Sequence, residues 1–406
     1  MSVPIIFDKS SFQGLNYGEI IELHRYYAVN VTPLLVNEIL GDLSKEEKAG
    51  KNPKDAVVNL SKKMFPYNSY VNMKFDKVIE ESLLGNFVEN DNRPFLIATK
   101  SVASENRNGL IFKETNEELS IKRWKEGKFD SIDEIISDVW RSESQDDKII
   151  EEFKNNFDHL GDIKVNNKLS NEDKLKDLKK KLRERLTIEL EPEDVLNVVL
   201  DYFNISYDVR ISIFERWNKG AFPDIEAFAE YVYYCYSIAA MYYLGIINNI
   251  YSERKTNLLD LQYLFYLPFA KVFSTNDKFL KSLFDVMQPV NVVFISLPDL
   301  KSDLAKFQKL NNPENWSEIP PDKNTYTYKI WDANFNLELS EKFRPSAKAI
   351  ERATKEFEDI LKLAESVKPG RFSGEPDFVL KHTYYSIDDP CPCKSGKALK
   401  DCHYKK

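Results

Sequence analysis

Two acidic residues follow short apolar runs that are typical of buried β-strands. Asp8 comes directly after Val3–Phe7 (VPIIF). Asp277 closes the turn Thr275-Asn276-Asp277, which follows the β-prone run Lys271–Ser274. Runs of this length, bounded by turn residues, predict interior strands of a parallel sheet. Ligands of open α/β sheets bind beyond the carboxyl ends of the strands, so both acids are expected at a functional edge.

Two further acids belong to predicted helices. Glu38 lies in a helix expected over Pro33–Leu43, for which Thr32 is the cap and Pro33 a favoured first residue. Asp260 heads an apolar helix expected over Leu261–Leu267, which Pro268 and Phe269 end. A third strand is expected at Ala28–Val31 and a fourth at Val292–Ser296.

Four carboxylates within a few ångströms would repel one another, and without a cation some would stay protonated. Hard divalent ions prefer such all-oxygen sites, and Mg²⁺ keeps several of its waters there. A metal-activated water can attack a phosphodiester, while the same metal stabilises charge on the phosphate and on the departing oxygen. His24, on the helix before the third strand, is expected to be structural rather than a base.

These pieces, in this order, resemble a PIN-like nuclease domain. They are D-x-S-S after the first strand, TPLLVNEIL, the Asp-headed apolar helix and the strand ending T-N-D. The resemblance covers residues 1–43 and 226–297. It implies Mg²⁺ or Mn²⁺ bound at the sheet's carboxyl edge and hydrolysis of nucleic acid, most often RNA. Carried over by position, the metal-binding and catalytic set is Asp8, Glu38, Asp260 and Asp277, with Ser10 and Thr275 as polar neighbours that help bind the cofactor. The alternatives are a PIN-like fold that has lost catalysis and four unrelated surface acids.

The C-terminal sequence CPCKSGKALKDCH carries the densest metal-ligating motif in the chain. Three thiols and an imidazole fall within 13 residues: Cys391, Cys393, Cys402 and His403. This set suits a closed, tetrahedral, structural Zn²⁺ site, in which the metal replaces a hydrophobic core that so short a tail cannot build. A disulfide is the alternative.

The same tail closely resembles the SEC-C motif, the zinc-binding tail of the SecA translocation ATPase. That resemblance implies partner docking, including to the ribosome. Five lysines accompany one acid in the knuckle, so it could contact rRNA, substrate RNA or an acidic protein. A fold-stabilising cap with solvated lysines is the alternative.

Composition limits the number of domains, the kind of surface and the location that the protein can have. A chain of 406 residues is expected to form two or three domains. The net charge of −8 argues against a surface broadly devoted to nucleic acid. The run Tyr231–Tyr251 has no charged residue, but seven of its residues are Tyr, so a buried helix holding the free thiol of Cys235 is expected instead of a membrane span. With no signal peptide expected, a cytoplasmic protein is predicted.

We therefore expect an α/β protein with a PIN-like parallel sheet flanked by helices, a large mostly α-helical insert and a small zinc knuckle. The expected divisions are 1–43 and 225–300 for the PIN-like domain, 44–224 for the insert, 301–380 for a helical or extended connector and 381–406 for the knuckle. Several helical residues fall at core-facing intervals: Trp124, Ile132, Ile135, Ile136, Val139 and Trp140. Tyr326–Trp331 alternates as a strand would. A lysine-rich helix opens at Ser170, and a solvated surface is favoured over an RNA-binding face because its acids nearly match its bases.

The function expected from these features is that of a metal-dependent nuclease, most often an endoribonuclease, with DNA a less favoured substrate. By analogy alone, this architecture suits a bacterial stress-response or phage-defence effector. The rival from another class is an inactive PIN-like adaptor that binds ribosomes or secretion factors through its tail.

Overall fold

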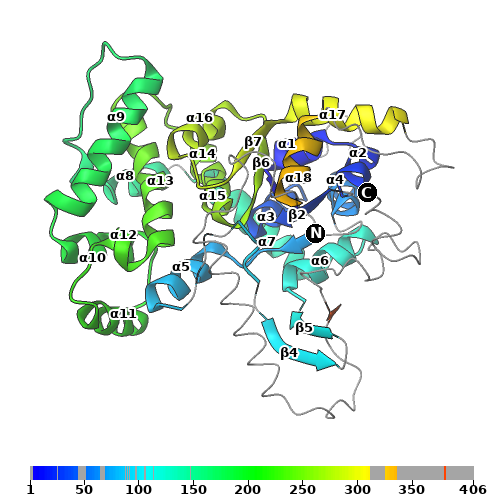
Figure 1. Cartoon of the computed structure of the whole chain (residues 1–406), viewed down its shortest axis with the longest axis horizontal. Helices are drawn as coiled ribbons and strands as arrows, with labels where there is room; N and C mark the ends of the chain where they lie inside the picture. The colour runs from blue at the N-terminus through cyan, green and yellow to red at the C-terminus, as the bar shows by residue number, and fades with distance from the viewer. Residues whose placement is uncertain are drawn as a thin grey trace.

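A five-stranded, wholly parallel β-sheet forms the centre of the fold (Figure 1). The computed structural model describes residues 3–24, 26–43, 52–64, 69–86, 88, 90, 92–96, 98–104, 107–112, 114–146, 148–310, 325–335 and 379–380. The strand order is β3-β2-β1-β6-β7. The strands are β1 (Val3–Phe7), β2 (Tyr27–Val31), β3 (Ser69–Val71), β6 (Val272–Thr275) and β7 (Val293–Ser296).

Four of these strands were predicted from their apolar runs, to within one residue at each end. The α/β class is thereby confirmed. Central parallel strands are buried on both faces, so they appear in a sequence as short continuous apolar runs. The fifth strand, β3, lies within 44–224 and pairs with β2, so this part of the range belongs to the sheet.

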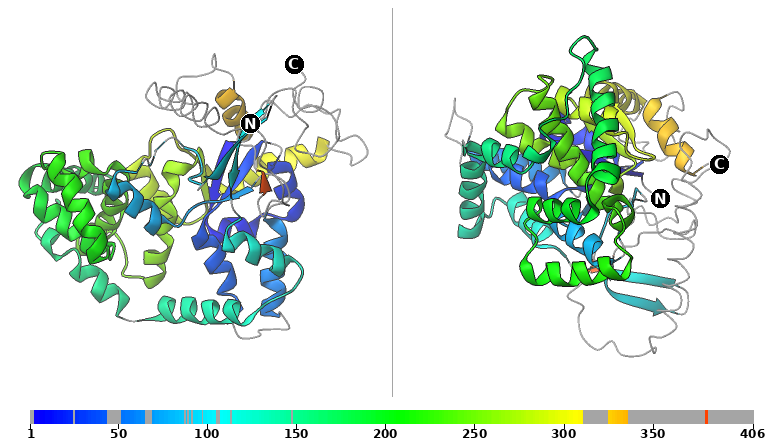
Figure 2. Two further views of the ribbon diagram at one scale, coloured as in Figure 1. Left: turned by 90° about the horizontal axis from the view of Figure 1, so that it is seen from below. Right: turned by 90° about the vertical axis from the view of Figure 1, so that its left-hand side faces the viewer.

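Helices cover the sheet and extend well beyond it on one side. Figure 2 shows the helices between α8 and α13 gathered at one end of the molecule and the parallel sheet at the other. A separate antiparallel sheet joins β4 (Ala98–Ser104), β5 (Arg107–Phe112) and β8 (Val379–Leu380). The α-helices are α1 (Lys9–Gly14), α2 (Tyr17–Leu23), α3 (Pro33–Leu40), α4 (Pro53–Lys63), α5 (Phe75–Leu84), α6 (Asn116–Lys125), α7 (Ser131–Gln145), α8 (Ile149–Asn155), α9 (Asn171–Glu184), α10 (Pro192–Tyr202), α11 (Tyr207–Lys219), α12 (Ile225–Phe228), α13 (Glu230–Ile247), α14 (Lys255–Asp260), α15 (Gln262–Phe265), α16 (Lys278–Met287), α17 (Leu297–Leu310) and α18 (Tyr326–Phe335).

The uncharged, tyrosine-rich run forms α13, which is buried along nearly its whole length. Its main neighbours are helices α5, α9, α12, α15 and α16. Tyrosine hydroxyls are satisfied inside the protein: Tyr231 donates to the Phe265 carbonyl oxygen at 3.1 Å and Tyr234 to that of Leu264 at 3.0 Å. Cys235 is a free, fully buried thiol, as predicted. Within the described ranges, no helix has both the length and the apolarity needed to cross a bilayer.

The prediction that α7 turns its isoleucines to the core is wrong. Ile132 and Ile135 are 62% and 61% exposed, whereas Asp133 is almost fully buried. Asp133 is drawn inward because it closes a capping box with Asp130 and pairs with Arg123 at 3.1 Å. These polar contacts fix the rotation of α7, so its isoleucines and Val139 are exposed. Trp140 of α7 packs partly buried against the core, and Trp124 of α6 is buried, as expected.

The strand-like alternation of Tyr326–Trp331 also fails as a predictor, because this stretch forms α18. Asp303 of α17 accepts hydrogen bonds from the backbone N–H of Thr327 at 2.9 Å and from its hydroxyl at 2.8 Å. The Thr325 hydroxyl accepts from the Tyr328 N–H at 3.2 Å. These bonds satisfy free N–H groups at the start of a helix, which an alternation of residue types does not reveal.

Candidate functional site

Asp8 and Asp277 lie at the carboxyl ends of the two central, neighbouring strands. β1 and β6 are parallel, and Phe7 pairs with Ser274, so the residues that follow them leave the sheet side by side. Both acids cap the helix that comes next. One oxygen of Asp8 accepts from the Ser11 N–H at 3.1 Å. One oxygen of Asp277 accepts from the N–H groups of Phe279 and Leu280, at 2.6 and 3.0 Å.

The two polar neighbours hold these acids in place. The Ser10 hydroxyl donates to the second carboxylate oxygen of Asp8 at 2.6 Å. The Thr275 hydroxyl accepts from the Asp277 N–H at 2.9 Å and so fixes the turn between β6 and α16. Their role in cofactor binding remains a prediction; in the structure they orient the carboxylate-bearing residues.

Glu38 approaches this edge from α3. Its carboxylate accepts a hydrogen bond from the hydroxyl of Tyr263, a fully buried residue of α15. Burial raises the pKa of Glu38, and the charges of Asp8 and Asp42 raise it further, against the opposing effects of Tyr263 and Lys9. The charge of Asp8 thus affects the pKa of Glu38, although the two residues belong to different elements.

Asp260 is the most perturbed of the four acids. It is the last residue of α14, where the sequence predicted the start of a helix. Burial, and then the charges of Glu38, Asp277 and Asp8, together raise its pKa to about 8. All three of the other acids therefore act on this one, and the predicted set occupies one acidic neighbourhood.

The carboxylates are not arranged as a ready ligand set. Within the described part of the chain, no three Asp, Glu, His or Cys side chains stand close enough together to hold a metal ion. Electrostatic coupling extends further than ligation distance, so the two observations are compatible: the acids converge without forming a preorganised cage. A cation would have to draw the side chains inward.

Two cations beside Asp277 were not identified from the sequence. Arg254 and Lys278 line a cavity of about 350 Å³ together with Asp277 and Asn257. Neither side chain forms an ion pair within the described residues. Lys278 directly follows the T-N-D turn, and this position in the sequence could have identified it as part of the site. Arg254 lies near Asp277 only because of the path that the chain takes before α14.

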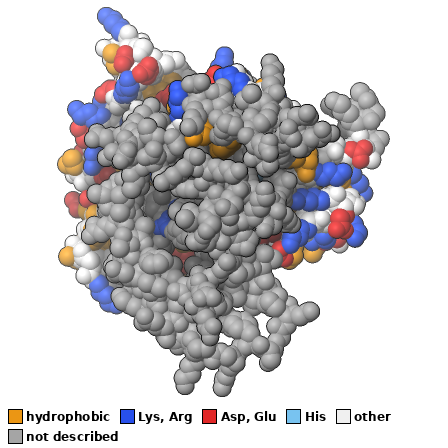
Figure 3. Space-filling model, turned by 45° about the vertical axis from the view of Figure 1, so that its right-hand side comes forward, with side chains coloured by type: hydrophobic (Ala, Val, Ile, Leu, Met, Phe, Trp, Pro, Cys, Tyr) orange, Lys and Arg blue, Asp and Glu red, His pale blue; other side chains and the backbone are white. Residues whose placement is uncertain are grey.

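At the margins of the view in Figure 3, where side chains are described, Lys and Arg side chains lie among Asp and Glu side chains. This agrees with the net charge of −8. His24 is buried at the end of α2, three residues before β2, which places it at the opposite edge of the sheet from Asp8.

The expected zinc ligands, Cys391, Cys393, Cys402 and His403, lie outside the described residues. No protein-family model matches the chain, and neither a curated protein nor a solved structure is significantly similar to it. The class that fold and site define by themselves is an α/β protein with an acidic centre at the carboxyl edge of a parallel sheet.

Proposed function

We propose that this protein is a metal-dependent nuclease of PIN-like fold, acting on RNA in preference to DNA, with a zinc-binding tail for docking. The observation that carries the proposal is the placement of Asp8 and Asp277 at adjacent carboxyl strand ends, with Glu38 and Asp260 coupled to them. Residues 8 and 277 are far apart in the chain, and only the fold brings them together.

The donor set fits a hard divalent cation. Burial raises the pKa of Asp260 most, and the charges of three neighbouring carboxylates raise it further. The second effect is expected of surplus negative charge in a site built for a cation. Asp8, Glu38, Asp260 and Asp277 would hold Mg²⁺ or Mn²⁺ through oxygen atoms. Once bound, such an ion supplies an activated water and neutralises charge on a phosphodiester.

Other residues of the chain orient the carboxylates and are suited to bind the substrate. The Ser10 hydroxyl and the Ser11 N–H orient Asp8, and Tyr263 orients Glu38. Arg254 and Lys278, beside Asp277, are suited to bind the phosphates that flank the cleaved bond. Two local cations suffice to hold a polyanion at one place on an acidic protein.

The test is cleavage of a labelled RNA and of the same sequence as single-stranded DNA, with Mg²⁺, Mn²⁺ or chelator. Asp8→Asn and Asp277→Asn should each lower the rate at least a hundredfold. The matched control is Asp285→Asn, which removes an exposed carboxylate of α16 that pairs with Lys281 outside the site. Chelator-resistant cleavage, or equal loss in the control, would refute the proposal.

One observation favours a second candidate, an inactive PIN-like adaptor that docks through its zinc tail to a ribosome or an acidic protein. It is the lack of a ready metal-ligand set in the described residues. Metal-dependent cleavage by the wild-type protein, lost in Asp8→Asn, excludes this candidate. Its own support would be ribosome binding without cleavage under any metal.

A further inference from the structure

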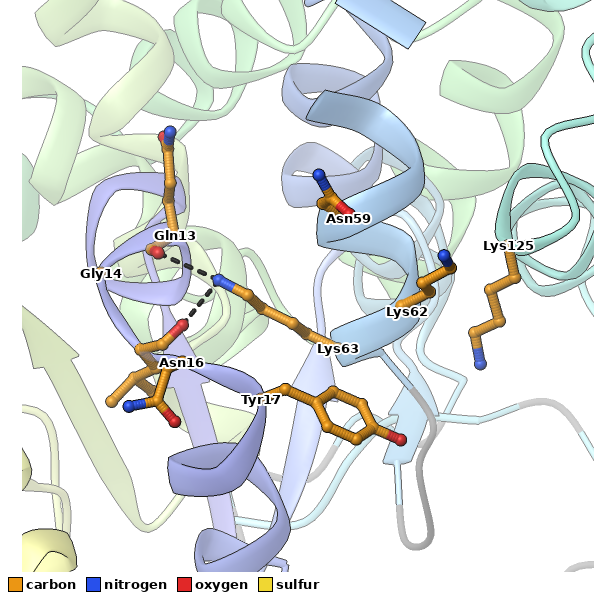
Figure 4. Close-up of a pocket in the computed structure, with 9 residues that line it drawn as sticks. Gln13, Gly14, Asn16, Tyr17, Asn59, Lys62, Lys63 and Lys125 are labelled. Atoms are coloured by element: carbon orange, nitrogen blue, oxygen red, sulfur yellow. Dashed lines mark hydrogen bonds between the residues drawn. The ribbon is translucent and has the colours of Figure 1, made fainter. Parts of the chain in front are cut away.

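A second cavity, of about 820 Å³, lies where the turn between α1 and α2 meets the last turns of α4 and α6. Figure 4 shows Lys63 of α4 reaching this turn, with Lys62 and Lys125 on the other side of α4 in this view. The lining includes Lys62, Lys63 and Lys125, with the polar side chains of Asn16, Tyr17 and Asn59. Asp8 caps the start of α1, and this cavity lies at the end of the same helix.

Lys63 is fixed in the cavity wall. Its ammonium group donates to the backbone carbonyl oxygens of Gln13 at 3.0 Å and Leu15 at 2.6 Å, as Figure 4 shows. The remaining carbonyl of this turn, that of Gly14, accepts from Lys301 at 2.7 Å. An ammonium group has three N–H donors. Two of those of Lys63 bond to these carbonyl oxygens, and among the residues that the structure describes none accepts the third.

The cavity carries a surplus of positive charge. Burial lowers the pKa of Lys63, and the charge of Lys301 lowers it further. Glu19 opposes this, but its carboxylate accepts from the Asn16 N–H at 2.7 Å and lies 3.5 Å from Lys301. Lys62 is exposed and forms no ion pair within the described residues. Lysines in the last turn of a helix also interact favourably with the helix dipole. Stabilisation of α4 and α6 is therefore the alternative role of these lysines.

An aromatic ring completes the lining. Tyr17 is 51% exposed at the first position of α2, although a tyrosine usually buries most of its ring. The amide side chain of Asn59 lies on the same wall as the α4 lysines. A flat, exposed ring beside lysines matches the two parts of a nucleotide, because bases stack on aromatic rings and phosphates bind ammonium groups.

We infer that this cavity binds a nucleotide, with its phosphate on Lys62, Lys63 and Lys125 and its base on Tyr17. The cavity of about 820 Å³ is open to solvent and has room for one nucleotide. The nucleotide can be one unit of a bound polynucleotide or a free mononucleotide. The site does not depend on the nuclease activity proposed above.

The experiment measures binding of a fluorescein-labelled pentauridylate by anisotropy, in an Asp8→Asn background that prevents cleavage without chelating zinc. Lys62→Ala with Lys125→Ala should weaken binding about tenfold or more. It should also lower the slope of log K against log salt by about 1.4, the value for two phosphate contacts on a single strand. The matched control, Lys176→Ala with Lys180→Ala, removes two exposed lysines of α9 that pair with Glu172 and Glu184.

Two further arms identify the ligand. Competition by uridine monophosphate at comparable affinity shows a mononucleotide site, and competition only by longer oligomers shows a polynucleotide site. Tyr17→Leu should weaken the pentauridylate and leave inorganic pyrophosphate competition unchanged. Wild-type binding by the lysine variant, or equal loss in the α9 control, overturns the inference. So does an unchanged affinity in Tyr17→Leu. Wild-type protein that never cleaves RNA leaves this assay intact and refutes only the nuclease.

Discussion

The ammonium group of Lys9 lies 2.8 Å from a carboxylate oxygen of Asp42 and donates to the backbone carbonyl oxygen of Glu38 at 2.7 Å. One lysine thus ties the end of α3 to the start of α1. Asp42 follows Glu38 by about one helical turn, so its carboxylate is an alternative metal ligand by position. The structure gives them different surroundings, because Asp42 has a cation as its partner and Glu38 has the neutral hydroxyl of Tyr263.

This difference predicts opposite results for two substitutions. Glu38→Gln should lose cleavage with little change in stability. Asp42→Asn should keep most of the activity but lower the free energy of unfolding by about 3 kcal/mol, because it leaves the half-buried Lys9 without its counter-charge. Cleavage rates and denaturant unfolding of both variants provide the measurement. If Asp42→Asn loses cleavage while Glu38→Gln keeps it, Asp42 is the ligand.

Asp260 should make stability depend on pH. Its pKa is about 8 in the folded protein, against 3.8 for an unperturbed aspartate. The folded state therefore holds a proton that the unfolded state releases, and stability falls as pH rises from about 4 through 8. Asp260→Asn has no such proton to lose. Without divalent metal, it should equal wild type near pH 4 and exceed it at pH 9, by up to about 6 kcal/mol for a shift of this size.

Thermal unfolding of both proteins across this pH range, with and without Mg²⁺, provides the check. Mg²⁺ should raise the Tm of wild type at pH 9 more than that of Asp260→Asn, because ligand binding to the folded state adds stability. A wild-type Tm that rises steadily between pH 5 and 9 without metal would contradict this account of Asp260.

Tyr263 is expected to act as a positioning residue for Glu38. Tyr263→Phe removes the hydrogen bond that lowers the pKa of Glu38, so this carboxyl should hold its proton more tightly and compete less well for metal. The Mn²⁺ concentration for half-maximal cleavage should rise about tenfold, as is usual when a group that orients a metal ligand is lost. Activity at saturating Mn²⁺ should largely recover.

The matched control is Tyr234→Phe. Tyr234 also donates its hydroxyl to α15, but to the Leu264 backbone carbonyl oxygen instead of a carboxylate. It should change stability without changing the Mn²⁺ requirement. An equal shift in both variants would mean that Tyr263 supports the fold alone.

The sheet and its acids were open to prediction because both leave local signals. A buried parallel strand is a short apolar run, and Asp8 and Asp277 follow such runs directly. β3, by contrast, spans only Ser69–Val71 and carries little of that signal. The rotation of α7 depended on the Asp133–Arg123 pair, which apolar periodicity does not record.

One cationic part of the site was beyond local reasoning for a different reason. Arg254 precedes α14 in the chain and meets Asp277 only through the fold, whereas Lys278 directly follows Asp277. The α4 and α6 lysines of the second cavity come from segments about 60 residues apart and face a turn near the N-terminus. A count of charges along the chain does not show which charged side chains lie together. The charge of a cavity depends on which of them line it.

The last prediction separates the two metals that the chain is expected to bind. The soft thiolate set of Cys391, Cys393 and Cys402 with His403 should hold zinc tightly, whereas the carboxylate site should exchange Mg²⁺ or Mn²⁺ readily. Elemental analysis should find about one zinc per chain, and Cys391→Ser with Cys402→Ser should remove it. Cleavage of a short RNA should survive, because the carboxylates come from the ends of β1 and β6 and from α3 and α14. Ribosome association should fall. Loss of short-RNA cleavage by a double variant with a wild-type Tm would make the tail part of the active site and refute this division of roles.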